Sequence, residues 1–554
     1  MMATAAEEIF QSPCPISERH VTTMSIKITR KNQDKPWKLR LIYLQCYFMS
    51  IATILGTGIL GLPVTIAHAG LMPFLVSFII GFFVQTTETE RILMQDVGLE
   101  EPALTNTEEE EEEVEDGEEA DTGLLQQDTA RQTLEEKLQP NLHVLGLLFL
   151  SKPMSHAFNF ILLFQFVSIG ISYVLAGSEA YAALLHVSHI YVIPGFTWTL
   201  SLGILLAQMV IQPITSLLTL LKGIMLIITV AVTFALGSEV QQETTNDFSQ
   251  IGKPFLMGTV ALGGIVNVMP LLFSEISHNK TQIMWFRRVI LGGLATCTVL
   301  NILWCWAVLE IVPQMSVQRV MEEGVVNTTS SVVSESSPTA YTMVYSNISL
   351  EESEKAGEIA TIPLTKIISL KYRHYSWVAE LIQIFIAISI TVSFLVMGSA
   401  MKHTIDGLVN SHWNTKLEWM SKVWERTLPQ SFHRCSSRGL ANGLISLLAF
   451  GIIFIVSSCD PRGFVVMLDK VVSFSLNTEV GLFIFVMLRA SRSERFQHLT
   501  VPLPVGQRVF QLHWSLPIYF LFAVAYDVIQ SIVEIAEHNL QHSSQPLLTN
   551  YSLS

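Results

Sequence analysis

Hydrophobic residues form eleven runs that are long enough to cross the roughly 30 Å hydrocarbon core of a membrane. Polar segments separate these runs, so the pattern predicts an all-α polytopic membrane protein with about eleven transmembrane helices. The predicted spans cover residues 41–67, 71–86, 154–183, 190–211, 215–236, 254–275, 287–312, 376–400, 439–458, 463–488 and 512–535. The second run is short and region 190–236 can be divided differently, so one span more or fewer remains an alternative.

Composition agrees with a protein embedded in the lipid bilayer. Half of the 554 residues are hydrophobic, 14% are charged and the mean hydropathy is +0.44, whereas about a quarter of the residues of a soluble protein are charged. The first 40 residues are polar and show no removable signal peptide, so we expect the first span to serve as the anchor. The six cysteines are scattered and indicate neither a disulfide framework nor a metal site.

Lysine and arginine concentrate in four polar segments on one side of an eleven-span arrangement: 27–40, 276–288, 401–438 and 489–511. Cytosolic flanks of membrane helices carry the excess of these residues. We therefore expect a cytosolic N-terminus and an extracellular or luminal C-terminus. The chain then divides into a cytosolic tail (1–40), two spans (41–86), a cytosolic loop (87–153), five spans (154–312), an outer loop (313–374), four spans (375–536) and an outer tail (537–554).

The two long loops carry different signals. The outer loop holds glycosylation sequons at Asn327 and Asn347, which suit N-glycosylation on that side of the membrane. The cytosolic loop holds eleven acids between Glu108 and Asp121, and without them the net charge of −14 would be −3. We expect this acidic loop to be disordered. Its Asp121, Leu124 and Leu125 also resemble an endolysosomal sorting signal, which would make sorting adaptors possible partners.

Glycine and proline interrupt the first span, which reads ILGTGILGLP from Ile54 to Pro63. Broken membrane helices survive only where the break is buried in protein or lines a cavity. If the chain unwinds at Gly56, Thr57 and Gly58, its free N–H groups form an anion site. The alternative is close helix packing through small residues.

The sixth span is interrupted in a corresponding place, with Gly258, Gly263, Gly264 and Pro270. Paired interruptions in two halves of a chain point to a transporter site near the membrane midplane. Spans one to five and six to ten are then expected to be inverted repeats, followed by one additional helix.

Several motifs resemble the amino acid/auxin permease family, which includes proton-coupled and sodium-coupled neutral amino acid transporters. They are GTGILGLP with AHAG, SYVLAGSEAYAAL, QPITSLLTL, MPLLFSEISHNKTQIMWFRR and ISITVSFLVMGSAMKHTIDGL. The resemblance implies a LeuT-like fold with a 5+5 inverted repeat. It also implies that Gly56, Thr57 and Gly58 bind a substrate carboxylate and that carbonyls around Gly263 and Gly264 bind the ammonium group. The family usually has an asparagine before the first glycines, where this chain has Ala52, Thr53 and Ile54.

Two ions are candidates for coupling. Span eight offers Ser389, Thr391 and Ser393, of which the two serines share a helical face. The family motif instead aligns Thr391 with the hydroxyl used by sodium-coupled members, so we expect a sodium site from Thr391 and carbonyls near Thr53. Proton coupling is the alternative. The intramembrane acids Glu479 and Glu179 are its candidates, although either can be a structural carboxylate.

We find no phosphate loop, zinc-ligand spacing or nucleophile elbow, so we expect no enzyme and no cofactor beyond a coupling sodium ion or proton. The basic loops fit membrane orientation better than nucleic-acid binding. The sequence therefore predicts a secondary active transporter of small amino acids in an endolysosomal, vesicular or plasma membrane. An amino-acid receptor with little or no transport is the alternative.

Overall fold

The computed structural model describes residues 36–98, 142–206, 208–240, 242, 244–273, 276, 280–321, 341–345, 347–412, 437–459, 467–490 and 515–544. The described part is a bundle of helices with one antiparallel hairpin. The α-helices are α3 (Pro36–Thr65), α4 (Leu71–Gly98), α6 (Leu142–Phe149), α7 (Lys152–Leu185), α8 (His189–Leu206), α9 (Gln208–Val240), α10 (Gly252–Gly263), α11 (Ile265–Phe273), α12 (Lys280–Ile311), α13 (Leu350–Ala356), α14 (Thr361–Lys371), α15 (Ser376–His412), α17 (Ser437–Cys459), α19 (Ser473–Thr478), α20 (Phe485–Ala490) and α22 (Ser515–Ser544).

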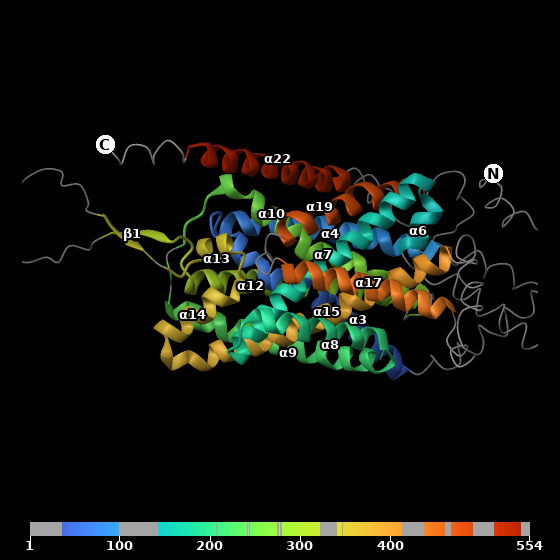
Figure 1. Cartoon of the computed structure of the whole chain (residues 1–554), viewed down its shortest axis with the longest axis horizontal. Helices are drawn as coiled ribbons and strands as arrows, with labels where there is room; N and C mark the ends of the chain where they lie inside the picture. The colour runs from blue at the N-terminus through green and yellow to red at the C-terminus, as the bar shows by residue number, and fades with distance from the viewer. Residues whose placement is uncertain are drawn as a thin grey trace, which may run out of the picture.

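Shorter elements complete the described chain. Two 3-10 turns are η3 (Phe248–Gln250) and η4 (Arg373–Tyr375), and two π-helical turns are η7 (Met467–Val472) and η8 (Glu479–Ile484). The hairpin pairs β1 (Val317–Met321) with β2 (Tyr341–Tyr345), with Val317 opposite Tyr345. Figure 1 shows the hairpin, α13 and α14 at one end of the bundle, while α22 runs along one edge.

The predicted eleven spans are confirmed within the described residues. Nine helices are long and apolar enough to cross a membrane, and the apolar stretches Leu71–Thr87 and Pro517–Val533 supply two shorter candidates. Each coincides with one predicted span, and the tenth span is built from η7, α19, η8 and α20. The protein is thus a helical, polytopic membrane protein, while the inverted repeat and the orientation stay predictions.

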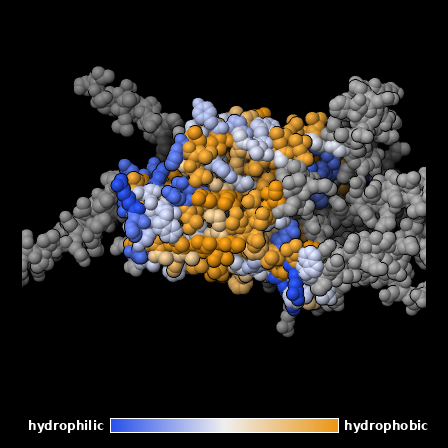
Figure 2. Space-filling view, turned by 90° about the horizontal axis from the view of Figure 1, so that it is seen from below, coloured by the Kyte–Doolittle hydropathy of each residue, from blue (hydrophilic) through white to orange (hydrophobic). Residues whose placement is uncertain are grey.

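The first and sixth spans lie at the centre of the bundle. In the most apolar 18-residue stretch of each helix, 88% of the first span and 89% of the sixth span are buried inside the bundle. The corresponding stretch of α17 is only 22% buried. α3 packs against α12, α10, α9 and α15. Figure 2 shows that the outside is a broad hydrophobic belt next to a polar end. The peripheral helices therefore carry the apolar surface suited to lipid, and the most apolar parts of the two central helices are buried inside the bundle.

Both long loops contain secondary structure in their described parts. The loop predicted to lie outside holds β1, β2, α13 and α14, and the ends of the 87–153 loop are helical because α4 continues to Gly98 and α6 begins at Leu142. Asn347 is exposed in the outer loop. Asn327 and the sorting residues Asp121, Leu124 and Leu125 lie outside the described residues, as does the acidic run.

Candidate functional site

The expected break in the first span is absent, and this prediction was wrong. α3 is helical without interruption from Pro36 to Thr65, through Gly56, Thr57 and Gly58, and a turn follows only after it. The sixth span is interrupted, but by the single residue Gly264 between α10 and α11. The first-span glycines therefore do not present an unwound backbone in this conformation.

Proline 63 still disturbs the hydrogen bonds of α3. It has no N–H, so the carbonyl of Ile59, four residues earlier, loses its usual helical donor. Trp304 on α12 replaces that donor, with Nε1 at 2.9 Å from the Ile59 oxygen. The next carbonyl, that of Leu60, accepts the N–H of Ala360 at 3.1 Å. Side chains and backbone from elsewhere in the chain thus stabilise a proline-containing helix as one piece.

The glycines of α3 allow polar side chains to approach its backbone. A Cβ at Gly56 would overlap Ser393 Oγ and would lie 2.7 Å from Tyr173 Oη. A Cβ at Gly58 would lie 2.6 Å from Asn301 Oδ1. The packing alternative from the sequence therefore explains both glycines, although their neighbours are polar rather than small.

A buried lysine lies between α3 and α15, the two helices from which we expected the ligands of a sodium ion. Lys222 on α9 has no exposed surface. Its Nζ donates to Ala52 O at 2.8 Å, to Ser393 Oγ at 2.9 Å and to Ser389 O at 3.3 Å. Ser393 Oγ in turn donates to Ala52 O at 3.3 Å. The ammonium group thus links α3, α9 and α15 through three oxygens, the full donor capacity of a protonated lysine.

Lys222 is not among the site residues predicted from the sequence, although a signal for it is present. It is the only charged residue in the predicted span 215–236. An ionisable residue inside a span is rare and usually functional. The long apolar run around Lys222 is otherwise typical of an ordinary span.

The structure separates Thr391 from this group. Thr391 Oγ1 donates to Ala387 O at 2.8 Å and is hydrogen-bonded to Tyr181 Oη on α7 at 2.9 Å. Helical spacing had placed Ser389 and Ser393 on one face, and these two residues contact Lys222. The polar contact between α15 and α3 is therefore made by Ser393, whereas Thr391 of α15 contacts α7. Thr53 lies against the sixth-span break, because a Cβ at Gly264 would be 3.6 Å from its Cγ2.

Several polar atoms near the centre have no protein partner. Tyr173 Oη and both amide atoms of Asn301 are buried without a hydrogen bond, beside Gly56 and Gly58 respectively. Asn267 on α11 is 4% exposed, and its amide atoms are likewise unpaired. Buried polar groups are nearly always hydrogen-bonded, so such atoms call for water, an ion or a ligand. A Cβ at Gly263 would lie 2.6 Å from Leu476 Cδ2 of α19, so this side of the sixth-span break packs on α19.

The two predicted acidic residues lie apart from this centre and from each other. Glu179 on α7 lies near Glu358 and near the backbone N–H of Ile359. Both of these residues belong to the segment that connects α13 with α14. Glu479 begins η8, has no exposed surface and faces Gln165 on α7. Neither contacts Lys222, so the structure divides the candidate ionic groups into separate places.

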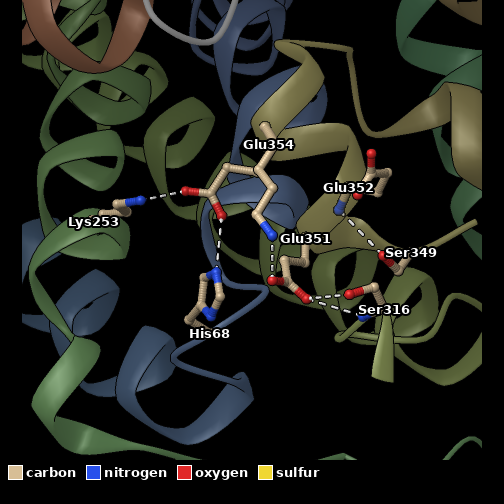
Figure 3. A network of polar contacts seen from close by, with 8 residues as sticks. His68, Lys253, Ser316, Ser349, Glu351, Glu352 and Glu354 are labelled. Atoms are coloured by element: carbon tan, nitrogen blue, oxygen red, sulfur yellow. Dashed lines mark hydrogen bonds and ion pairs between the residues drawn. The ribbon is translucent and has the colours of Figure 1, made fainter. Parts of the chain in front are cut away.

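A network of ions and hydrogen bonds holds α13 against the end of the bundle (Figure 3). Glu354 lies between two partners, with Oε1 at 2.6 Å from Lys253 Nζ and Oε2 at 3.7 Å from His68 Nε2. Glu351 accepts from the N–H and Oγ of Ser316 at 3.0 and 2.9 Å. We call residues 349–371 the outer cap. It covers the end of α3, because Ala360 binds the Leu60 carbonyl there.

Comparisons with known proteins leave the family open. No protein-family model and no curated protein sequence matches the chain. Solved structures that resemble it include three of the Eremococcus coleocola manganese transporter. Two of the three are single-residue mutants. The first mutant is 11% identical with a TM-score of 0.48, and the match covers 91% of this chain and 90% of the mutant's chain. The second mutant is 12% identical with a TM-score of 0.49, and the match covers 93% of this chain and 91% of the mutant's chain.

The third is a complex with an aromatic bis-isothiourea substituted compound, at 10% identity and a TM-score of 0.47, covering 90% of this chain and 87% of that one. These values are too low to carry over an activity or a transported ion.

Proposed function

We propose that the protein is a secondary active transporter of small amino acids that is driven by protons, with Lys222 as the coupling group. The observation that carries this proposal is the buried ammonium bound by Ala52 O, Ser389 O and Ser393 Oγ. Carbonyl and hydroxyl oxygens of this kind are ligands for a hard cation. A lysine supplies that cation from within the chain, which removes the need for sodium.

Protonation of Lys222 would then control the contact between α3 and α15. The charged side chain holds both helices by donating to oxygens on each. A neutral amine has one donor fewer and forms weaker hydrogen bonds, since bonds from charged donors are roughly twice as strong. Loss of the proton would let α3 separate from α15, and a conformational change at this contact would open the centre of the bundle.

The unpaired polar atoms around α3 support a small polar substrate. Tyr173 Oη and the amide of Asn301 can accept from an ammonium group or donate to a carboxylate. The motifs that resemble the amino acid/auxin permease family support an amino acid over other polar solutes. A receptor that keeps the fold but transports little remains the second candidate.

The test uses the full-length protein reconstituted in vesicles with a mixture of radiolabelled neutral amino acids. We expect an inward proton gradient to drive accumulation equally well in sodium and in choline buffer. Lys222→Met should abolish gradient-driven accumulation, because it removes the exchangeable proton and keeps the length of the side chain. Lys402→Met is the matched control, since Lys402 also lies on the membrane helices but is only half-buried.

Three results would contradict the proposal. Accumulation that requires sodium would exclude the lysine as the coupling cation. Accumulation by Lys222→Met at the wild-type level would show that the ammonium is structural. Saturable binding without any flux would favour the receptor.

A further inference from the structure

We infer that Glu479 and Gln165 form a second proton-binding site, separate from Lys222, at the contact between α7 and the tenth span. The inference rests on the proposed proton-driven transport for its role, but the site itself follows from packing. Both side chains have 0% exposed surface. Gln165 is the polar side chain that interacts with the Glu479 carboxyl group.

Neither side chain is satisfied by the protein. Apart from their approach to each other, both carboxyl oxygens of Glu479 and both amide atoms of Gln165 lack a hydrogen-bond partner. An ionised Glu479 would be a buried charge without a counter-ion at membrane depth, which is energetically costly. Neutralisation by a proton removes that cost, and the added O–H is a donor that the Gln165 carbonyl oxygen can accept.

Other ionisable groups do not neutralise Glu479. η8 packs against α7, α19, α20 and α22. The ionisable residues on these elements are Lys152, His156, Tyr173, Glu179 and Tyr181 on α7, Arg489 on α20, and Tyr519, Tyr526 and Asp527 on the apolar part of α22. None of them forms a hydrogen bond with Glu479, and the described ion pairs do not include it. A bound proton is therefore the simplest counter-charge.

A proton fits better than a metal ion. Sodium and larger cations need several oxygen ligands, and the polar group that faces Glu479 across the contact is the single side-chain amide of Gln165. An apolar contact lies between the same two elements, since the rings of Phe158 of α7 and Phe483 of η8 have centroids 5.5 Å apart and are tilted by 52°. Binding breaks one O–H bond of a hydronium ion, forms one O–H bond on the carboxylate and leaves a water molecule on whichever side the contact opens.

The backbone at this position supports movement. Glu479 is the first residue of a π-helical turn, and a second one, η7, precedes α19. π-helical turns are rare and occur frequently at functional sites. With a wide turn at each end, the six-residue α19 can rotate between two packed arrangements. A rotation that separates Glu479 from Gln165 would expose the carboxyl group to water and release its proton.

Infrared spectroscopy of the reconstituted protein tests the site without any transport assay. We expect a protonated-carboxyl band near neutral pH that disappears on alkaline titration, shifts in deuterium oxide and is absent from Glu479→Gln. Asp527→Asn is the control, because Asp527 is also a buried acid, 5% exposed, but lies on α22. An unchanged band in Glu479→Gln, or a Glu479 band that responds to sodium at fixed pH, would overturn the inference.

Transport then tests the role of the site. We expect Glu479→Gln to move one proton fewer per amino acid than wild type and to keep substrate exchange, because the amide mimics the protonated acid. Gln165→Leu should keep the proton count and shift the pH profile. An unchanged proton count in Glu479→Gln would reduce the site to a structural acid. If wild type shows the band but no flux, the proposed function fails and the proton site stands.

Discussion

Gly56 has no room for a side chain, because a Cβ would overlap Ser393 Oγ and approach Tyr173 Oη to 2.7 Å. We predict that Gly56→Ala destabilises the protein by about 1–3 kcal/mol, the usual cost of overpacking. It should also lower proton-driven uptake, since Ser393 holds the Lys222 ammonium. Thermal unfolding in detergent and vesicle uptake measure the two effects.

Gly264→Ala is the matched control for that substitution. A Cβ there would meet Thr53 Cγ2 at 3.6 Å, which is an ordinary contact, and the glycine has helical φ and ψ of −55° and −21°. We expect this variant to keep nearly the wild-type melting temperature. Equal stability of the two variants would show that the Gly56 environment adapts, and the packing argument would fail.

At the scale of residues, the helical period predicts that Ser389 and Ser393, four positions apart, share a face. Lys222 donates to the backbone carbonyl of Ser389 and to the hydroxyl group of Ser393. The family motif pointed to Thr391, which bonds to Tyr181 instead. Lys222 was visible as a lone charge in an apolar run. Its partner Ala52 was not predictable, because nothing in the sequence sets which α3 carbonyl faces α9.

At the scale of elements, α3 shows why glycine and proline do not by themselves predict a break. Both residues permit a break and also permit a continuous helix whose backbone finds outside partners. Trp304 supplies the donor that Pro63 lacks, from 241 positions along the chain. The outcome depends on tertiary contacts of this kind, which local sequence does not encode.

The outer cap depends on one carboxylate that binds two elements. Glu354→Gln should weaken the contacts with Lys253 and His68 and increase hydrogen exchange in α13, because an amide forms no ion pair. A change of about 1–3 kcal/mol in local opening free energy is expected for a hydrogen bond to a charged group. Glu352→Gln removes the same charge from the same helix but neither contact. Equal exchange in both variants would contradict a specific role of Glu354.

The neighbouring carboxylate makes the stability of the cap depend on pH. Hydrogen bonds from Lys355, then Ser316, lower the pKa of Glu351 from 4.5 to about 2. A lowered pKa contributes stability that is fully present above the unfolded value and is lost as pH falls through the folded value. We predict that protection of the Ser316 amide, corrected for intrinsic exchange, stays constant above pH 4.5 and decreases as the pH is lowered from 4.5 to about 2. Protection that does not decrease in this acidic range would show that Glu351 has the same pKa in the folded and unfolded states.

At the scale of the whole molecule, the number and place of the spans were predictable because bilayer thickness sets the length of an apolar run. The helices α13 and α14 were not predictable from such runs, since they are short and depend on contacts with α3 and with the segment after α12. Leu350 N–H, for example, donates to Pro313 O.

Topology provides the whole-molecule prediction. Asn347 is exposed next to α13, and Arg489 lies at the end of α20. The background replaces by serine Cys459, which is exposed, together with Cys14 and Cys435, which lie outside the described residues. In it, Asn347→Cys should react with an impermeant maleimide added outside intact cells or right-side-out vesicles. Arg489→Cys should react only after permeabilisation. The opposite pattern would invert the assigned orientation, and labelling of both from one side would contradict the eleven-span arrangement.

The sequon at Asn347 shares its third residue with the start of α13. Ser349 is 0% exposed, and its Oγ accepts the N–H of Glu352 as the helix cap. The glycan-transferring enzyme must reach the whole Asn-x-Ser sequence. A sugar can therefore be attached only before α13 folds. If Asn347 is modified in cells, the fraction of chains that carry the sugar records how long this segment stays open during synthesis, so variants that delay its closure should emerge more completely glycosylated.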